Sequence, residues 1–115
     1  MLSFHYGPMN AGKSVALLQQ AHTYSEVNKK VLLLVPATMN ATTISSRIGI
    51  EKPAIVIDES VDLHFFLADE NQKIQISCVF IDEAQFLTCE QVWQLANFSS
   101  THQIPVKCFG LRTDF

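Results

Sequence analysis

The chain has 115 residues, of which 48% are hydrophobic and 17% are charged, a composition typical of one compact globular domain with its own core. The formal net charge is −3 and the chain has only 8 Lys and Arg residues, which disfavours nucleic acid as a main partner. No apolar run approaches the roughly 20 residues of a membrane span, and the first residues lack the pattern of a secretory signal. We therefore expect a cytoplasmic protein with neither nucleic-acid nor membrane partners. Its charge is still compatible with binding small phosphorylated ligands.

The three cysteines, Cys78, Cys89 and Cys108, are odd in number and widely separated, and they form no Cys-x-x-Cys pair. This pattern predicts neither a disulfide framework nor a zinc site within these residues. Cys78 and Cys108 lie in apolar runs, where a cysteine is usually a small buried hydrophobic residue.

Apolar runs of strand length alternate with segments of helical character along the chain. Strands are predicted at Leu2–Tyr6, Val31–Val35, Ala54–Ile57, Ile74–Ile81 and Val106–Gly110. A helix is predicted at 13–27, with Val15, Leu18 and Ala21 on its apolar face. A second helix is predicted at 60–70, with Ser60 as cap and Val61, Phe65 and Ala68 on its apolar face. A third is predicted from Thr88 to about Phe98, with Gln91 completing a capping box. Residues 37–53 are predicted to form a long loop.

This order of elements predicts an α/β fold with a mainly parallel β-sheet flanked by helices. Ligand loops in such a fold follow the carboxyl ends of the strands. Phe115 comes just after a strand end, so we expect the domain to continue beyond it.

The segment Gly7-Pro8-Met9-Asn10-Ala11-Gly12-Lys13-Ser14 matches the phosphate-binding pattern G-x-x-x-x-G-K-[ST] at every defined position. The two glycines let the backbone turn sharply and approach phosphate oxygens, and the following helix adds its unpaired N–H groups and dipole. Lys13 supplies a cation to the β- and γ-phosphates, and Ser14 supplies a hydroxyl to Mg²⁺. The sequence therefore predicts a P-loop NTPase (RecA-like) domain over residues 1–115 that binds a nucleotide.

Two apolar strands run into Asp-Glu, at Asp58-Glu59 and at Asp82-Glu83. A P-loop protein needs a carboxylate at a neighbouring strand end to hold magnesium. We assign Asp82 to Mg²⁺ because its strand is longer and because an amide and an aromatic residue follow it. Glu83 is placed to accept a proton from an attacking hydroxyl or water, and Asp58-Glu59 is then a solvated strand-to-helix junction. The nucleotide site is predicted to include Asp82, Glu83, Ala84 and Gln85 besides the loop.

Four motifs occur in order: Gly-Pro-Met-Asn-Ala-Gly-Lys-Ser, Ser45-Ser46-Arg47-Ile48-Gly49, Asp82-Glu83-Ala84-Gln85-Phe86-Leu87 and Gly110-Leu111-Arg112-Thr113-Asp114-Phe115. Together they resemble the zinc-containing, P-loop thymidine kinases, most of all the bacterial members, over essentially the whole chain. The resemblance implies transfer of the ATP γ-phosphate to the 5′-hydroxyl of thymidine or deoxyuridine, in nucleotide salvage for DNA synthesis. It implies Glu83 as the base and Arg47 beside the transferred phosphate. It also implies a base pocket lined by Met9, Phe86, Leu111 and Phe115.

The family's chain continues past the Thr-Asp-Phe segment into a zinc-bearing region and a lasso loop that closes over the nucleoside, and its members form homotetramers. We expect zinc only in that region, and at most trace kinase activity from residues 1–115 alone. Two alternatives stay open. One is a helicase-like or other nucleic-acid-dependent ATPase, which the Asp-Glu-Ala-Gln motif resembles, and the other is a non-catalytic nucleotide-binding fragment.

Overall fold

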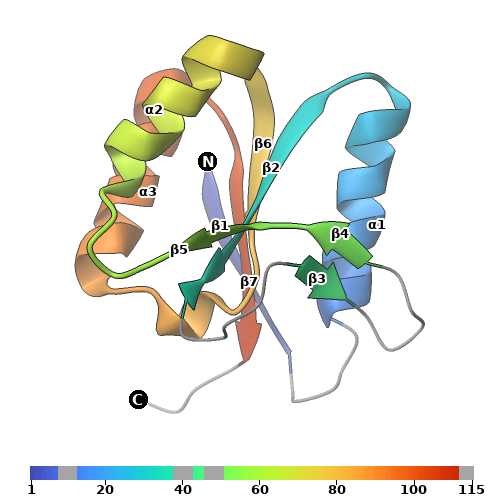
Figure 1. The fold of residues 1–115 in the computed structure, drawn as a ribbon, viewed down its shortest axis with the longest axis horizontal. Helices are drawn as coiled ribbons and strands as arrows, with labels where there is room; N and C mark the ends of the chain where they lie inside the picture. Colours follow the sequence, from blue (N-terminus) through green and yellow to red (C-terminus); the bar gives the residue numbers. More distant parts are fainter. Residues whose placement is uncertain (8–12, 38–42, 46–50, 112–115) are drawn as a thin grey trace.

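A computed structural model describes residues 1–7, 13–37, 43–45 and 51–111. Its centre is a sheet of five strands, all paired in parallel, in the order β1-β7-β6-β2-β5 (Figure 1). The strands are β1 (Leu2–Gly7), β2 (Lys30–Pro36), β5 (Ile55–Ile57), β6 (Ile76–Ile81) and β7 (Val106–Leu111). The helices are α1 (Lys13–Glu26), α2 (Leu63–Ile74) and α3 (Cys89–His102). The predicted α/β fold with a parallel sheet is confirmed.

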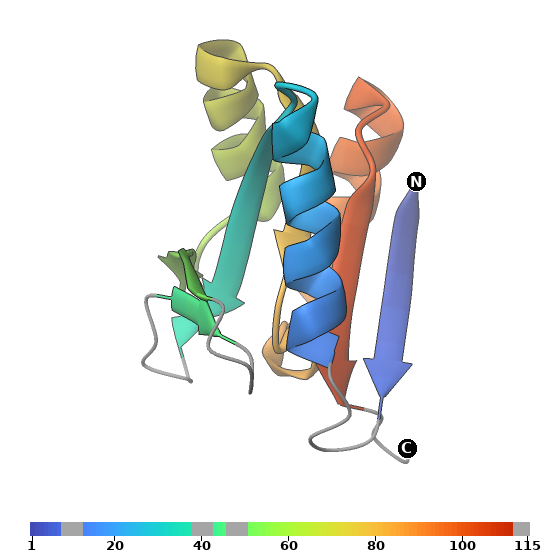
Figure 2. The same ribbon diagram turned by 90° about the vertical axis from the view of Figure 1, so that its right-hand side faces the viewer.

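The helices cover both faces of the sheet, with α1 on one face and α2 and α3 on the other (Figures 1 and 2). Alternate residues of a strand therefore pack into different cores. On β6, Cys78 and Phe80 pack with the buried residues of α1, whereas Val79 and Ile81 pack with those of α2 and α3. This two-sided burial explains why the central strands are continuous apolar runs in the sequence.

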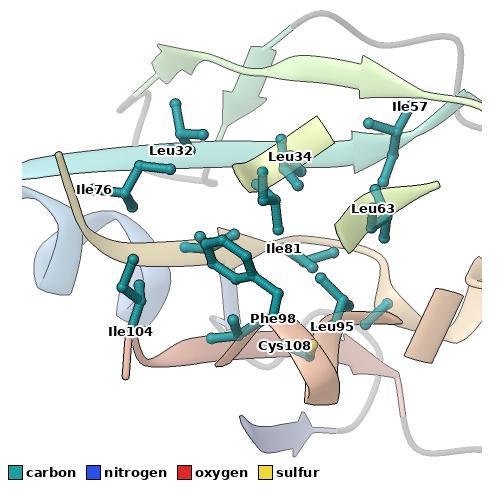
Figure 3. Close-up of a cluster of buried hydrophobic side chains, with 14 residues drawn as sticks. Leu32, Leu34, Ile57, Leu63, Ile76, Ile81, Leu95, Phe98, Ile104 and Cys108 are labelled. Carbon is teal, nitrogen blue, oxygen red and sulfur yellow. The ribbon is translucent and has the colours of Figure 1, made fainter. Parts of the chain in front are cut away.

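The larger core lies between the sheet and the α2–α3 layer (Figure 3). Phe98 and Leu95 of α3 meet Ile81 of β6 there, and all three side chains are fully buried. Burial of each such side chain contributes about 1.5–3 kcal/mol to folding. This packing fixes α3 against β6, and it therefore also fixes the short segment between them, residues 82–88.

Helix α2 differs from its prediction in where it begins and in which face it buries. It starts at Leu63 and is capped by Asp62, whose carboxylate accepts the N–H of Phe65 at 3.1 Å; the cap is not Ser60. The later start places Leu63 and Leu67 in the core and leaves Phe65 73% exposed, so the predicted inward position of Phe65 is wrong. The helix continues to Ile74, which the sequence had suggested as the first residue of β6.

Helix α3 begins with the predicted capping box. The Thr88 hydroxyl accepts the N–H of Gln91 at 3.0 Å, and the Gln91 side chain accepts the N–H of Thr88 at 3.2 Å. The helix runs past Phe98 to His102 and ends at Gln103 in the left-handed conformation. None of the described helices, of which α1 and α3 have 14 residues each, has the length and apolarity to cross a membrane.

The segment 37–53 is not the simple loop that was predicted. Strands β3 (Thr43–Ser45) and β4 (Glu51–Pro53) pair antiparallel, with Ile44 opposite Lys52. The β-branched pair Thr43-Ile44 favours extended backbone, and Pro53 is tolerated at the end of a two-stranded ribbon. This ribbon lies beside α1 (Figure 1).

Candidate functional site

The candidate site lies at the edge of the sheet where all five strands end, because parallel strands have their carboxyl ends at the same edge. Strand β7 lies between β1 and β6, with Leu111 paired to Gly7 and Cys108 paired to Ile81. Neighbouring strands are about 4.8 Å apart, so β1 and β6 run about 10 Å apart, and the register places the end of β1 three residues beyond the end of β6. Segments distant in the chain, the β1–α1 junction and residues 82–86, are thus brought to one edge.

The predicted phosphate loop connects β1 to α1. Gly7 is the last residue of β1, and Lys13 and Ser14 are the first residues of α1. Helix α1 starts at the same end of the sheet where β7 terminates (Figure 2). The first N–H groups of a helix have no partner within it, and its dipole is positive at this end, so α1 presents an anion-binding terminus to this edge.

Asp82 follows β6 directly and its side chain is only 7% exposed. Its N–H donates to the carbonyl of Leu34 on β2 at 3.0 Å, which extends the β2–β6 pairing by one residue. Its carboxylate oxygen Oδ1 accepts the N–H of Glu83 at 2.9 Å. The sheet therefore positions a carboxylate at the carboxyl end of β6, as the sequence predicted.

Glu83 adopts the left-handed conformation, with φ 56° and ψ 42°. A residue other than glycine is uncommon there, and such backbone strain persists where the surroundings impose it. The 3₁₀ turn η2 (Ala84–Phe86) follows at once, and the N–H of Phe86 donates to the carbonyl of Glu83 at 3.1 Å. The Gln85 amide Nε2 donates to the Glu83 carboxylate Oε2 at 2.6 Å. Gln85, predicted for the nucleotide site, thus contacts the predicted base.

The rest of η2 combines a buried and an exposed residue. Ala84 is 8% exposed and belongs to the larger core, whereas Phe86 is 46% exposed. An aromatic ring with this exposure at the edge of a predicted site offers a surface for stacking. Gly110 of β7 lies against η2, and a Cβ placed there would be 2.6 Å from Gln85 Oε1. Sequence reasoning missed this contact. The one feature of the sequence that indicates it is a glycine inside a predicted strand, which often marks a close approach.

Asp58, the rejected alternative to Asp82, lies in a different setting. It follows β5, the outermost strand on the side of the sheet opposite β1. β5 is four strand spacings from β1, or about 19 Å at the usual spacing. Its exposed carboxylate accepts hydrogen bonds from the hydroxyl and the N–H of Ser60, the latter at 2.8 Å. These bonds, first of all that from the hydroxyl, lower the pKa of Asp58 below its ordinary value. Asp58 therefore fixes the turn between β5 and α2.

Several predicted site residues fall outside the part of the chain that the structure describes. Residues 8–12, Arg47 and Phe115 lie outside the described residues, as do the side chains of Lys13, Ser14 and Leu111; their assignments stay predictions. Within the described ranges, no group of three or more His, Cys, Asp and Glu side chains is arranged to hold a metal ion. All three cysteines are free thiols, with Cys78 and Cys108 buried and Cys89 exposed.

The profile of the thymidine kinase family matches residues 1–115, the whole of the given sequence. The chain belongs to the thymidine kinase family. A thymidine kinase of Idiomarina loihiensis is 47% identical over 116 residues, covering 98% of this chain and 60% of that protein. The thymidine kinase of Enterobacteria phage T4 is 45% identical over 117 residues, covering 99% of this chain and 61% of that protein. The thymidine kinase of Salmonella typhimurium (strain LT2) is 41% identical over 117 residues, which is 57% of its length.

These relationships confirm the resemblance inferred from the four motifs, including its bacterial character. The chain spans about 60% of the length of the curated relatives it matches.

Proposed function

We propose that this chain supplies the nucleotide-binding domain of a thymidine kinase, which transfers the γ-phosphoryl group of ATP to the 5′-hydroxyl of thymidine or deoxyuridine. The observation that carries the proposal is the separation of β1 and β6 by the single strand β7. This order brings the Asp82-Glu83 pair to the edge at which β1 ends and α1 begins.

On the donor side, the triphosphate binds the loop from Gly7 to Ser14. Support comes from the complete motif, with a strand before it and a helix after it. Backbone N–H groups of the loop and of the first turn of α1 donate to phosphate oxygens, and Lys13 neutralises the β- and γ-phosphates.

The donor set fits magnesium. Mg²⁺ keeps several waters and takes one or two protein oxygens, so it needs no cluster of three protein ligands. The carboxylate of Asp82, 7% exposed and bonded through Oδ1 to the next N–H, is a fixed oxygen donor of this kind, and the Ser14 hydroxyl is the second. An ion held by these two residues would neutralise charge that develops on the β- and γ-phosphate oxygens.

On the acceptor side, Glu83 takes the proton of the 5′-hydroxyl as the oxygen forms its bond to the γ-phosphorus. The bond from that phosphorus to the bridging oxygen breaks, and ADP leaves. Arg47 is assigned to the charge on the transferred group. Phe86, whose exposed ring lies three residues from Glu83, stacks on the thymine together with Met9, Leu111 and Phe115. Catalysis then rests on positioning and electrostatics, as in other phosphoryl transfers.

The test is ADP release in the presence of thymidine by protein that contains this chain. Lys13→Ala should abolish nucleotide binding, measured by calorimetry, and leave the fold intact. Asp82→Asn should weaken Mg²⁺-dependent nucleotide binding, whereas the matched control Asp58→Asn should not. The reverse pattern would move the metal to the other strand. ADP release that depends on single-stranded or duplex DNA, and not on thymidine, would instead favour the nucleic-acid-dependent ATPase.

We further propose a cytoplasmic location, which the three unbonded cysteines support, since disulfides are rare in reducing compartments. Family resemblance alone supports a homotetramer, which light scattering on the purified protein would test.

A further inference from the structure

The carboxylate of Glu83 and strand β7 are connected through one side chain, that of Gln85. Its Nε2 lies 2.6 Å from Glu83 Oε2, and its Oε1 lies over Gly110. An ionised carboxylate only accepts hydrogen bonds, so the Gln85 amide must turn its NH₂ group toward Glu83. That orientation necessarily directs Oε1 to the opposite side, which is where β7 passes.

The position of Oε1 depends on position 110 having no side chain. A Cβ on residue 110 would lie 2.6 Å from Gln85 Oε1 and 3.3 Å from the backbone nitrogens of Ala84 and Gln85. The first distance is far below any normal contact, so the amide would have to move. The other two require shifts of only a few tenths of an ångström. An alanine at position 110 would therefore displace the end of Gln85 rather than the turn itself.

The turn does not need the Gln85 side chain for its conformation. Backbone bonds close it, from Phe86 N–H to the Glu83 carbonyl and from Leu87 N–H to the Ala84 carbonyl, both at 3.1 Å. Burial of Ala84 in the core anchors it further. The bond from Gln85 to Glu83 instead acts on the orientation of a long, rotatable carboxylate.

We propose that Gln85 is a positioning residue that holds the Glu83 carboxylate in the orientation for proton transfer, and that Gly110 provides the space the Gln85 amide requires. This rests on the proposed role of Glu83 as base. Gln85 then acts through Glu83 and not through the nucleotide, in contrast to the nucleotide-binding role predicted for it from sequence. Variants of Gln85 should therefore lower turnover without lowering nucleotide affinity.

The first experiment measures kcat, KM and Mg-ATP affinity in an active, full-length thymidine kinase that contains this chain. It compares Gln85→Leu with the matched control Gln72→Leu, which lies at an exposed position of α2. Gln85→Leu should lower kcat about 10- to 100-fold, the range seen when the partner that orients a functional ligand is removed. Mg-ATP affinity should change less than twofold. A parallel fall in affinity would assign Gln85 to the nucleotide and overturn the proposal.

The second experiment is a double-mutant cycle. Gly110→Ala alone should lower kcat in the same way, and in the Gln85→Leu background it should have little further effect, because both changes act through one amide. Multiplicative losses would show that Gly110 acts independently of Gln85, which would overturn the coupling.

A third measurement does not depend on turnover. The Gln85 side-chain amide resonances, assigned by their loss in Gln85→Leu, should move in both Glu83→Gln and Gly110→Ala, and stay in place in Gln72→Leu. Unchanged resonances in Gly110→Ala would overturn the proposal whether or not the protein is active. Conversely, if these resonances move as expected while Glu83→Gln retains full turnover, the structural link stands, and the assignment of Glu83 as base, with the positioning role that rests on it, is wrong.

Discussion

Gln91 offers a direct test of how the candidate site is attached to the rest of the fold. Its side chain is only 3% exposed, and its Nε2 donates to the carbonyls of Asp58 at 2.9 Å and Val61 at 3.2 Å. Its Oε1 accepts the N–H of Thr88 at 3.2 Å. One amide thus joins the turn before α2 to the start of α3, directly after the segment that carries Asp82.

Gln91→Leu keeps a similar volume and removes all three hydrogen bonds. At about 1 kcal/mol for each bond the loss is about 3 kcal/mol. Asp58 lies on the exposed turn, where water can replace the amide at its carbonyl, and leucine gains some apolar burial. We therefore expect the free energy of unfolding to fall by about 2–3 kcal/mol.

Urea unfolding followed by circular dichroism measures this difference. The midpoint should fall while the slope stays the same, which indicates a loss of stability without a change in the surface exposed on unfolding. Gln19→Leu, at an exposed position of α1, is the control and should stay within about 0.5 kcal/mol of the parent. A Gln91→Leu protein that is as stable as this control would refute the reasoning, because it would mean that the three bonds contribute nothing net.

Three further outcomes follow from burial and hydrogen bonding. The Ser60 hydroxyl and N–H lower the pKa of Asp58, so this carboxylate stabilises the fold above about pH 4 and the contribution is lost as the pH falls through the lowered pKa. Ser60→Ala should raise the pKa of Asp58 in an NMR titration, and an unchanged value would contradict the assigned cause. Burial raises the pKa of the Cys108 thiol to about 12, so at pH 8 iodoacetamide should label exposed Cys89 and spare Cys108 in native protein, as peptide mapping would detect. Phe98→Ala should lower the free energy of unfolding by about 3–5 kcal/mol in urea titrations, because the ring is fully buried, and a loss below 1 kcal/mol would contradict that packing.

The parts of the fold that could be predicted are those that local chemistry determines. The run Val31–Val35 is aliphatic throughout because β2 is covered on both faces, and the capping box at Thr88 and Gln91 needs only residues three apart. Each of these features is encoded within about ten consecutive residues, so the sequence alone was sufficient for them.

The start of α2 shows where local chemistry is ambiguous. Ser60 and Asp62 are both good cap residues, and both lie just before the apolar positions of the helix. In the folded chain the Ser60 hydroxyl donates to Asp58, and this leaves the cap to Asp62. The competing bond is made to Asp58, in the turn that follows β5. A prediction based only on the residues of the helix cannot take this bond into account.

The role of Gly110 could not be predicted for a different reason. Its neighbours, Ala84 and Gln85, precede it by 26 and 25 residues, and they meet it only because β7 inserts between β1 and β6. A glycine in a strand indicates that another group approaches the backbone closely, but it does not identify that group.

The same strand order separates the two acidic strand ends that the sequence could hardly distinguish. β6 lies two strand spacings, about 10 Å, from β1, and in the proposed site a hydrated Mg²⁺ would occupy the space between Asp82 and the phosphates. At four spacings Asp58 is too far away, and its carboxylate is engaged by Ser60. The last strand in the sequence, β7, therefore sets the distance on which the proposed metal site depends, and this is why the choice between Asp58 and Asp82 becomes a physical argument only once the sheet is known.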